Sequence, residues 1–266
     1  MIHEYGKGLE TYYTTHGEKG NPAVLLLHGL GAEMNMWSEQ ISLLEDHGYH
    51  VIALDLLCHG QSSHVEHLSL EAWNEQIKTL LASIAIKKIA IVGIGMGGVI
   101  AQHFAVTNKN LVDALVTCDS YGELETIYDK FTNVVSMLGL RFFQVMGRNA
   151  FVWYNDMKFN HSYAIKAWEY FMEVSYKQDI REIIKVKKAI NKAVPMQELK
   201  GLKIPALVMV GEHENKHFID VNKRIAKHLR VSDFLVLGAA KKPSNLTNPL
   251  KFDGALLKFL RDVYYN

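Results

Sequence analysis

The fold of this chain is decided by the stretch Ile89-Ala90-Ile91-Val92-Gly93-Ile94-Gly95-Met96-Gly97-Gly98. Its first half is apolar and largely β-branched, which is typical of a strand that is covered on both faces of a sheet. Its second half carries four glycines and leads directly into a helix that we expect over residues 99–106. Strand, tight turn and helix in immediate succession predict a buried α/β unit at the centre of a larger sheet.

Length and composition fit one large α/β domain with an insertion. The 266 residues are 48% hydrophobic, which supports a full core and argues against disorder. The formal net charge is only +1, so it indicates neither a nucleic-acid nor a membrane partner. Cys58 and Cys118 are too few for a disulfide framework, the N-terminus lacks a signal-peptide pattern, and no apolar run approaches the ~18 residues of a membrane span. We expect a soluble cytoplasmic protein.

Strands and helices alternate on both sides of the central unit. Short apolar runs predict strands at 22–27, 51–55, 111–118, 206–210 and 234–237. Helical spacing of apolar residues predicts helices at 36–47, 70–84, 218–229 and 249–264. This order favours a mostly parallel sheet with helices on both faces.

One segment departs from the alternation. Residues 122–200 contain no obvious strand and are rich in methionine and aromatic residues. We interpret them as a helical cap inserted into a core domain made of residues 1–121 and 201–266. The inner surface of such a cap is expected to be apolar, which makes Trp153, Met137 and Phe142 candidates for substrate binding.

Four motifs then occur in a familiar order. His28-Gly29 follows an early strand, and Asp55-x-x-x-His59-Gly60-x-Ser62 follows the next, with Cys58 where glycine is usual. Gly93-x-Gly95-x-Gly97-Gly98 stands where G-x-S-x-G-G belongs, and Gly211-Glu212-His213-Glu214 follows a late strand. With these motifs the chain resembles the small, capped branch of the α/β-hydrolase superfamily over nearly its whole length. The resemblance implies an α/β-hydrolase fold with a mostly parallel, eight-stranded sheet, flanking helices and a helical cap.

The resemblance also implies where a catalytic triad would lie, and the chain departs from it. Gly95 occupies the position of the nucleophilic serine, and Lys241 falls at the position of the histidine, with Lys242 as the alternative if the turn slips by one residue. Glu214 stands at the position of the acid, where aspartate is more usual, and Asp119 is a rival for that role. We therefore expect the chain to be inactive as a serine hydrolase.

The oxyanion hole is expected to survive these replacements. Its donors would be the backbone N–H groups of Leu30 and Met96, which do not depend on the side chains. Gly95 accepts the left-handed backbone of such a turn without strain. The neighbouring His28 and Gly29 belong to the same substrate-facing loop, although a bond from the His28 side chain to the backbone is the more ordinary role.

Four hypotheses about function stay open. The chain is an inactivated relative of enzymes that act on carboxylic esters, lactones or related acyl bonds; a ligand-binding pseudoenzyme; an engineered or repurposed enzyme that uses Lys241 as a base or Schiff-base nucleophile; or a hydrolase with another nucleophile such as Cys118. We prefer the first as a description of lineage and rank the lysine enzyme second. The expected partner is a small hydrophobic acyl or carbonyl compound. We expect no cofactor and no metal, since two histidines beside Glu214 do not make a metal site.

Overall fold

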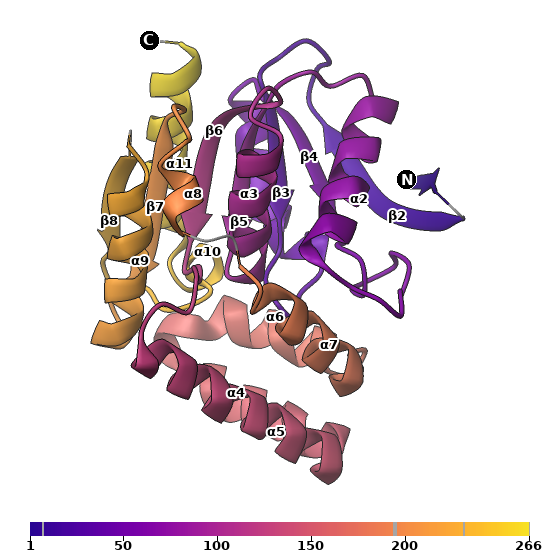
Figure 1. Ribbon diagram of the computed structural model, residues 1–266, viewed down its shortest axis with the longest axis vertical. Helices are drawn as coiled ribbons and strands as arrows, with labels where there is room; N and C mark the ends of the chain where they lie inside the picture. The colour runs from indigo at the N-terminus through magenta and orange to yellow at the C-terminus, as the bar shows by residue number, and fades with distance from the viewer. Residues whose placement is uncertain (7, 194–195, 231, 266) are drawn as a thin grey trace.

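The computed structural model describes residues 1–6, 8–193, 196–230 and 232–265, so that Lys7, Val194, Pro195, Val231 and Asn266 lie outside the described residues. Within these residues the chain forms one eight-stranded sheet with the strand order β1-β2-β4-β3-β5-β6-β7-β8 (Figure 1). The strands are β1 (Ile2–Tyr5), β2 (Leu9–His16), β3 (Ala23–Leu27), β4 (His50–Leu54), β5 (Ile89–Ile94), β6 (Val112–Cys118), β7 (Ala206–Gly211) and β8 (Ser232–Leu237).

The sheet is parallel from β4 to β8, and only the hairpin β1–β2 and its junction with β4 are antiparallel. Strands β3, β4, β5 and β7 are buried along their whole length, which is why their sequences are continuously apolar and do not alternate. The expected α/β-hydrolase fold with a mostly parallel, eight-stranded sheet is therefore confirmed.

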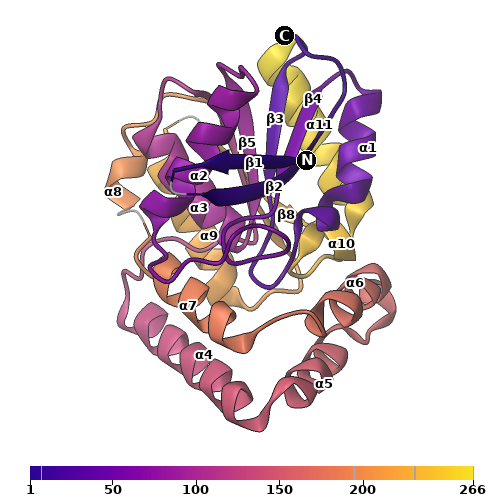
Figure 2. The same ribbon diagram turned by 90° about the vertical axis from the view of Figure 1, so that its right-hand side faces the viewer.

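Helices cover both faces of the sheet (Figure 2). The helices of the core are α1 (Ser38–Asp46), α2 (Leu70–Ser83), α3 (Met96–Thr107), α8 (Met196–Leu199), α9 (Lys216–His228), α10 (Ser244–Thr247) and α11 (Pro249–Tyr264), with a short 3₁₀ helix at Met34–Trp37. Trp73 and Phe104 anchor the core under α2 and α3, while Trp37 and Phe252 anchor the opposite face under α1 and α11. Helix α3 begins at Met96, earlier than the expected residue 99, because it starts directly at the Gly95 turn.

Four helices, called the cap, lie beyond the carboxyl ends of the parallel strands (Figures 1 and 2). They are α4 (Ile127–Met146), α5 (Arg148–Phe159), α6 (Ile165–Ser175) and α7 (Ile180–Ile190), with a 3₁₀ turn at Ser162–Ala164. Helix α8 lies inside the range expected for the cap, but Met196 and Leu199 pack into the core beside α9. Among the described residues, none of the helices is long and apolar enough to cross a membrane.

Polar contacts join the cap to the core on one side of the cavity between them. The backbone N–H of Glu33 donates to the Tyr170 hydroxyl of α6 at 2.7 Å, and the Gln178 side-chain amide donates to the carbonyl of Gly31. These contacts fix α6 and the start of α7 against the loop that follows β3, which is the loop expected to carry an oxyanion donor.

Candidate functional site

The turn between β5 and α3 has the backbone of a nucleophile elbow. Gly95 has φ 56° and ψ −112°, and its N–H donates to the carbonyl of Cys118 at 2.9 Å. A residue with a Cβ is strained at this φ, whereas glycine is not. The adjacent glycines are required by close packing, because a Cβ on Gly97 would collide with the backbone carbonyl of Leu27 and one on Gly98 would collide with Ser120.

The lysine that faces Gly95 is Lys242. A Cβ built on Gly95 would lie 3.1 Å from Cε and 3.4 Å from Nζ of Lys242. Of the two lysines that the sequence offers for the histidine position, the structure thus brings Lys242, the alternative, beside Gly95. The backbone of Lys241 instead donates to and accepts from the Thr247 hydroxyl. In the turn after β8, Ala239 takes a left-handed φ of 53°.

Two carboxylates hold the segment that carries Lys242. Glu214 Oε1 accepts the backbone N–H of Lys242 at 3.0 Å. The Asp119 carboxylate, which is fully buried, accepts the N–H of Ser244 at 2.7 Å and that of Gly211 at 2.9 Å. Burial raises the pKa of Asp119, and the two backbone donors oppose that rise. Both residues named as acids thus lie beside the expected site and position its backbone.

A cavity of about 160 Å³ opens over this turn, between the core and the cap. Gly29, Leu30, Gly95 and Lys242 line its core side. Its cap side is mainly apolar and is formed by Leu140, Phe151, Tyr154, Asn155, Lys158, Phe159, Phe171, Gln178 and Ile183. The site is therefore a small hydrophobic chamber with an amine at its floor.

The three cap residues expected to bind substrate do not line this cavity. Trp153 and Phe142 are 60% and 57% exposed, and Met137 packs against the small cap cluster around Phe151. The helical register explains the difference, since neighbouring positions such as Tyr154 turn inward while Trp153 turns outward. The composition of this segment predicts helices but does not tell which side of each helix faces the core.

Sequence reasoning also missed a group of charged residues around Tyr121. The ammonium nitrogens of Lys242 and Lys187 lie 4.1 and 4.7 Å from the centre of the Tyr121 ring. The charge of Lys242 is the main cause that lowers the pKa of Tyr121 to about 8. Tyr121 comes just after the end of β6, two residues beyond Asp119, and that place at the end of a central strand could have marked it as a site residue. Lys187 lies on a cap helix, where nothing in the sequence pattern distinguishes it from a surface lysine.

Lys158 of α5 joins this group from the other side of the cavity. Enclosure of its ammonium group by the protein, and then the charge of Lys242, lower its pKa to about 8. The residue as a whole still has an exposed surface, so solvent screens part of this effect. Two lysines, Lys158 and Lys242, therefore line the chamber, while Lys187 lies behind it on the Tyr121 ring and Glu214 holds the Lys242 backbone.

The two residues expected to donate to an oxyanion lie at the loop after β3 and at the start of α3. Leu30 lines the cavity, and Met96 is the first residue of α3, so its N–H has no acceptor within the helix. The His28 side chain is fully buried, with Nδ1 2.9 Å from the carbonyl of Gly29 and Nε2 accepting the N–H of Leu56 at 3.0 Å. Its burial lowers its pKa to about 4. His28 thus shapes the loop and does not line the cavity.

Cys118, the alternative nucleophile, is fully buried at the end of β6 and does not line the chamber. Burial, with a further contribution from Asp119, raises the pKa of its thiol well above the ordinary value. A thiol in this environment is a poor nucleophile near neutral pH.

Comparison with known proteins assigns the scaffold. Residues 22–248 match the family model described as alpha/beta hydrolase fold. A curated relative, 3-oxoadipate enol-lactonase 1 of Acinetobacter baylyi, is 23% identical over 250 residues, covering 93% of this chain and 92% of the relative. Epoxide hydrolase 4 of Mus musculus is 34% identical over 112 residues, which are 41% of this chain and 31% of the relative.

Solved structures agree over almost the whole chain. The structure reported for carboxylesterases of Nitrososphaera gargenis superposes with a TM-score of 0.87 at 19% identity, covering 99% of this chain and 98% of that one. The enol-lactonase of Burkholderia xenovorans superposes with a TM-score of 0.77 at 20% identity, covering 96% and 97%. At these identities the superpositions establish the shared fold.

Proposed function

This chain belongs to the α/β-hydrolase family, and we propose that it is a carbonyl-binding member of the esterase and lactonase lineage in which the amine of Lys242 replaces the serine–histidine pair. It takes a small, largely apolar aldehyde or ketone into the chamber under the cap and holds it as a reversible imine. The observation that carries the proposal is the Lys242 Nζ, 3.4 Å from the place of the missing Cβ on Gly95.

Serine acyl transfer needs a nucleophile, a base and an acid that orients the base. Gly95 supplies no side chain, and a lysine stands where the base belongs. Asp119 is occupied by the N–H groups of Gly211 and Ser244, and Glu214 accepts the backbone N–H of Lys242. In this proposal the hydrolytic triad is replaced at two positions, Gly95 and Lys242. Asp119 and Glu214 are kept, and their carboxylates hold the backbone of the segment that carries Lys242.

Imine formation uses groups that this chamber supplies. Lys242 first gives up its ammonium proton to solvent; its amine then adds to the carbonyl carbon, a C–N bond forms, and the C=O electron pair moves to oxygen. The N–H groups of Leu30 and Met96 stabilise that oxyanion, as they would in acyl transfer. Both protons of that nitrogen then move in turn to the oxygen, the oxygen leaves as water, and the lysine is joined to the ligand as an imine. No oxidant or other reactant is required.

Proton transfer in this step needs groups that titrate near neutral pH. Tyr121 and Lys158 both have pKa values lowered to about 8, by the charge of Lys242 and by enclosure respectively. Tyr121 lies against the Lys242 ammonium, and Lys158 lines the chamber. These two side chains are the candidates for carrying the proton between nitrogen, oxygen and water.

A second candidate function is non-covalent binding of a small carboxylate, and the charge of the chamber favours it. Lys158 and Lys242 line the chamber, Lys187 lies behind it on the Tyr121 ring, and the N–H groups of Leu30 and Met96 would add further donors for an anion. A pseudoenzyme that retains the acid product of its ancestral reaction would use the same groups without a covalent step.

The two candidates are separated by trapping. The chain is incubated with a panel of short aliphatic and aromatic aldehydes and ketones, treated with borohydride and examined by intact-mass and peptide mass spectrometry. A stable adduct on Lys242, heavier by the compound less one oxygen atom, is expected. Lys242→Met should abolish it, and Lys241→Met, which changes the neighbouring lysine outside the chamber, should leave it intact. Absence of an adduct with every compound, together with tight carboxylate binding, supports the second candidate instead.

The lineage is tested by restoring the triad. The Gly95→Ser/Lys242→His double variant is expected to turn over p-nitrophenyl esters with short acyl chains, whereas the unchanged protein is not. Equal turnover by both proteins would place the nucleophile elsewhere and bring Cys118 forward. Blocking with a thiol reagent then decides whether Cys118 is responsible.

A further inference from the structure

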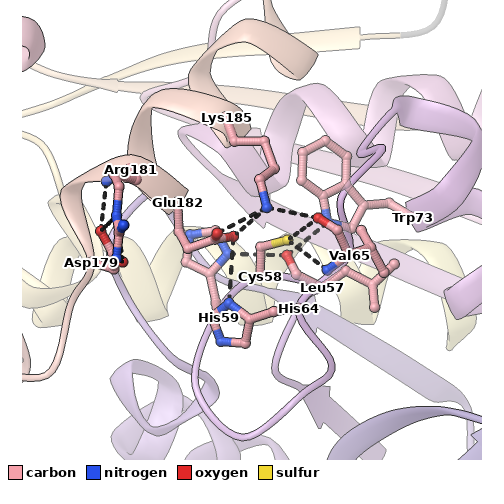
Figure 3. A network of polar contacts seen from close by, with 10 residues as sticks. All are labelled: Leu57, Cys58, His59, His64, Val65, Trp73, Asp179, Arg181, Glu182 and Lys185. Carbon is pink, nitrogen blue, oxygen red and sulfur yellow. Dashed lines mark hydrogen bonds and ion pairs between the residues drawn. The ribbon is translucent and has the colours of Figure 1, made fainter.

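A second cavity, of about 240 Å³, lies beside the chamber at the edge of the cap. Cys58, His64 and Glu182 meet in it, and one ligand atom of each lies within 4.8 Å of the others (Figure 3). Cys58 and His64 belong to the loop after β4, whereas Glu182 belongs to cap helix α7. The fold therefore brings three metal-ligating side chains together from segments that are far apart in the sequence.

Cys58 has an unusual backbone conformation for a residue with a side chain. Its φ of 67° is left-handed, a conformation that glycine adopts freely and a residue with a Cβ adopts only at a cost. The residue is 4% exposed, and the N–H of Val65 donates to its sulfur at 3.5 Å. The thiol in turn donates weakly to the carbonyl of Val65 at 3.8 Å, and an N–H that donates to sulfur is an outer-shell contact that would also support a ligating thiolate.

We propose that Cys58, His64 and Glu182 bind a divalent cation of the zinc class, in a four-coordinate site whose last position is taken by water. Sulfur, imidazole nitrogen and carboxylate oxygen are the ligands that Zn²⁺ prefers, and three protein ligands with an open position form a standard arrangement. On binding, Cys58 releases its proton to solvent and becomes a thiolate.

One of the three distances between ligand atoms already has the length of a metal site, and all three are within 4.8 Å. Tetrahedral bonds of normal length place ligand atoms about 3.3 to 3.6 Å apart. His64 Nδ1 and Glu182 Oε2 are already 3.4 Å apart. His64 is 55% exposed in its side chain, so it is free to turn the remaining distance toward the cation.

Lys185 already places a positive charge beside Glu182, one of the three proposed ligands. Its Nζ lies 2.8 and 2.9 Å from the two Glu182 oxygens and 2.7 Å from the carbonyl of Val65 (Figure 3). The lysine neutralises Glu182 when no cation is bound. With a cation present, one carboxylate oxygen serves the ion and the other keeps Lys185, as outer-shell groups do around ligating carboxylates.

A cation here would tie the cap to the core. Gly31, Gln178 and Ile183 line both this cavity and the chamber that contains Lys242. An ion shared between the loop after β4 and α7 therefore stiffens one wall of the chamber. This inference stands on the side chains at the cap edge and is independent of imine formation by Lys242.

The test is a titration of the full chain, stripped with a chelator and kept reduced, with Cd²⁺ and then with Zn²⁺ as competitor. We expect one equivalent of Cd²⁺ to produce the ultraviolet absorption of a cadmium–thiolate bond and to raise the melting temperature. Cys58→Gly should lose that absorption and still fold, since glycine suits the left-handed backbone at this position. His64→Gln should weaken binding by roughly 10- to 100-fold or more, and Lys185→Met should tighten it severalfold.

His67→Gln is the matched control, because His67 is an exposed histidine on the same loop outside the cluster. It should bind like the unchanged protein. The proposal is overturned if stoichiometric Cd²⁺ gives no thiolate absorption, or if the absorption persists in Cys58→Gly, which would assign it to Cys118. Equal losses in His64→Gln and His67→Gln would likewise overturn the assignment of His64.

Discussion

The ammonium nitrogen of Lys242 lies 4.1 Å from the centre of the Tyr121 ring. Its charge is the largest cause that lowers the pKa of Tyr121 to about 8. Lys242→Met is therefore expected to move the pKa of Tyr121 back toward 10. The pKa is measured by following tyrosinate absorbance during an alkaline titration of each protein. Subtracting the titration of the same protein with Tyr121→Phe leaves the signal of Tyr121 alone. Lys241→Met should leave it near 8, and an unchanged value in Lys242→Met would remove Lys242 as the cause.

Anion binding in the chamber should weaken as the pH rises through 8. Lys158, with its pKa lowered to about 8, loses its positive charge over this interval, and Tyr121, also near 8, gains a negative one. Both changes disfavour a carboxylate. Calorimetric titration of a short-chain carboxylate between pH 6.5 and 9.5 measures the effect. Lys158→Met should weaken binding at the lower pH and flatten the pH dependence, whereas Lys166→Met, on a neighbouring cap helix, should not.

Two buried histidines should make the fold sensitive to mild acid. Burial lowers the pKa of His28 to about 4 and that of His59 to about 3, below the ordinary 6.5 of an unfolded chain. The unfolded state therefore binds more protons below pH 6.5, and stability falls as the pH drops from there toward 4. At pH 5 each histidine should cost about 2 kcal/mol relative to pH 7.

Urea unfolding at pH 7 and pH 5 measures this loss. His28→Gln is expected to be less stable at pH 7, because two backbone hydrogen bonds are disturbed, and to lose less stability on acidification. His47→Gln, which replaces an exposed histidine, provides the control and should keep the full pH dependence. An unaltered pH dependence in His28→Gln would show that His28 is already protonated in the folded state or plays no part.

The packing of α3 against the sheet predicts a contrast between two glycines. A Cβ on Gly97 would collide with the backbone of Leu27 and His28, so Gly97→Ala should destabilise the fold by about 3 kcal/mol or more. A Cβ on Gly254 in α11 would meet nothing within 4 Å, so Gly254→Ala should be neutral or stabilising by about 0.5–1 kcal/mol. Chemical denaturation of both variants tests the pair, and equal effects would argue against the packed glycine turn.

The sheet could be predicted from sequence because its strands are short, continuously apolar and separated by helical patterns. The glycines at 93, 97 and 98 added a local constraint, since close packing of strand and helix leaves no alternative residue there. The site was harder to predict. Which of two adjacent lysines faces Gly95 depends on the conformation of Ala239 and on the Thr247 hydroxyl, and neither leaves a pattern in the sequence.

Contacts between distant segments were also hidden from the sequence. In sequence Lys158 and Lys187 resemble ordinary surface lysines of a helix, yet the cap brings Lys158 to the chamber and Lys187 to the Tyr121 ring. Cys58 was noted only as a departure from glycine, and its neighbours His64 and Glu182 become visible when the loop and α7 are placed together. Residue type and spacing along the chain do not report such proximity, because it is created by the docking of the cap.

The tight approach of Lys242 to the missing Cβ on Gly95 makes these two positions epistatic. A side chain at 95 crowds a lysine at 242, and the same lysine penalises the return of a serine, beyond the strain that any Cβ meets at this φ. Gly95→Ser alone therefore obliges the end of the Lys242 side chain to shift by a few tenths of an ångström, whereas Lys242→His removes that contact. The two substitutions are expected to be better tolerated together than the serine alone.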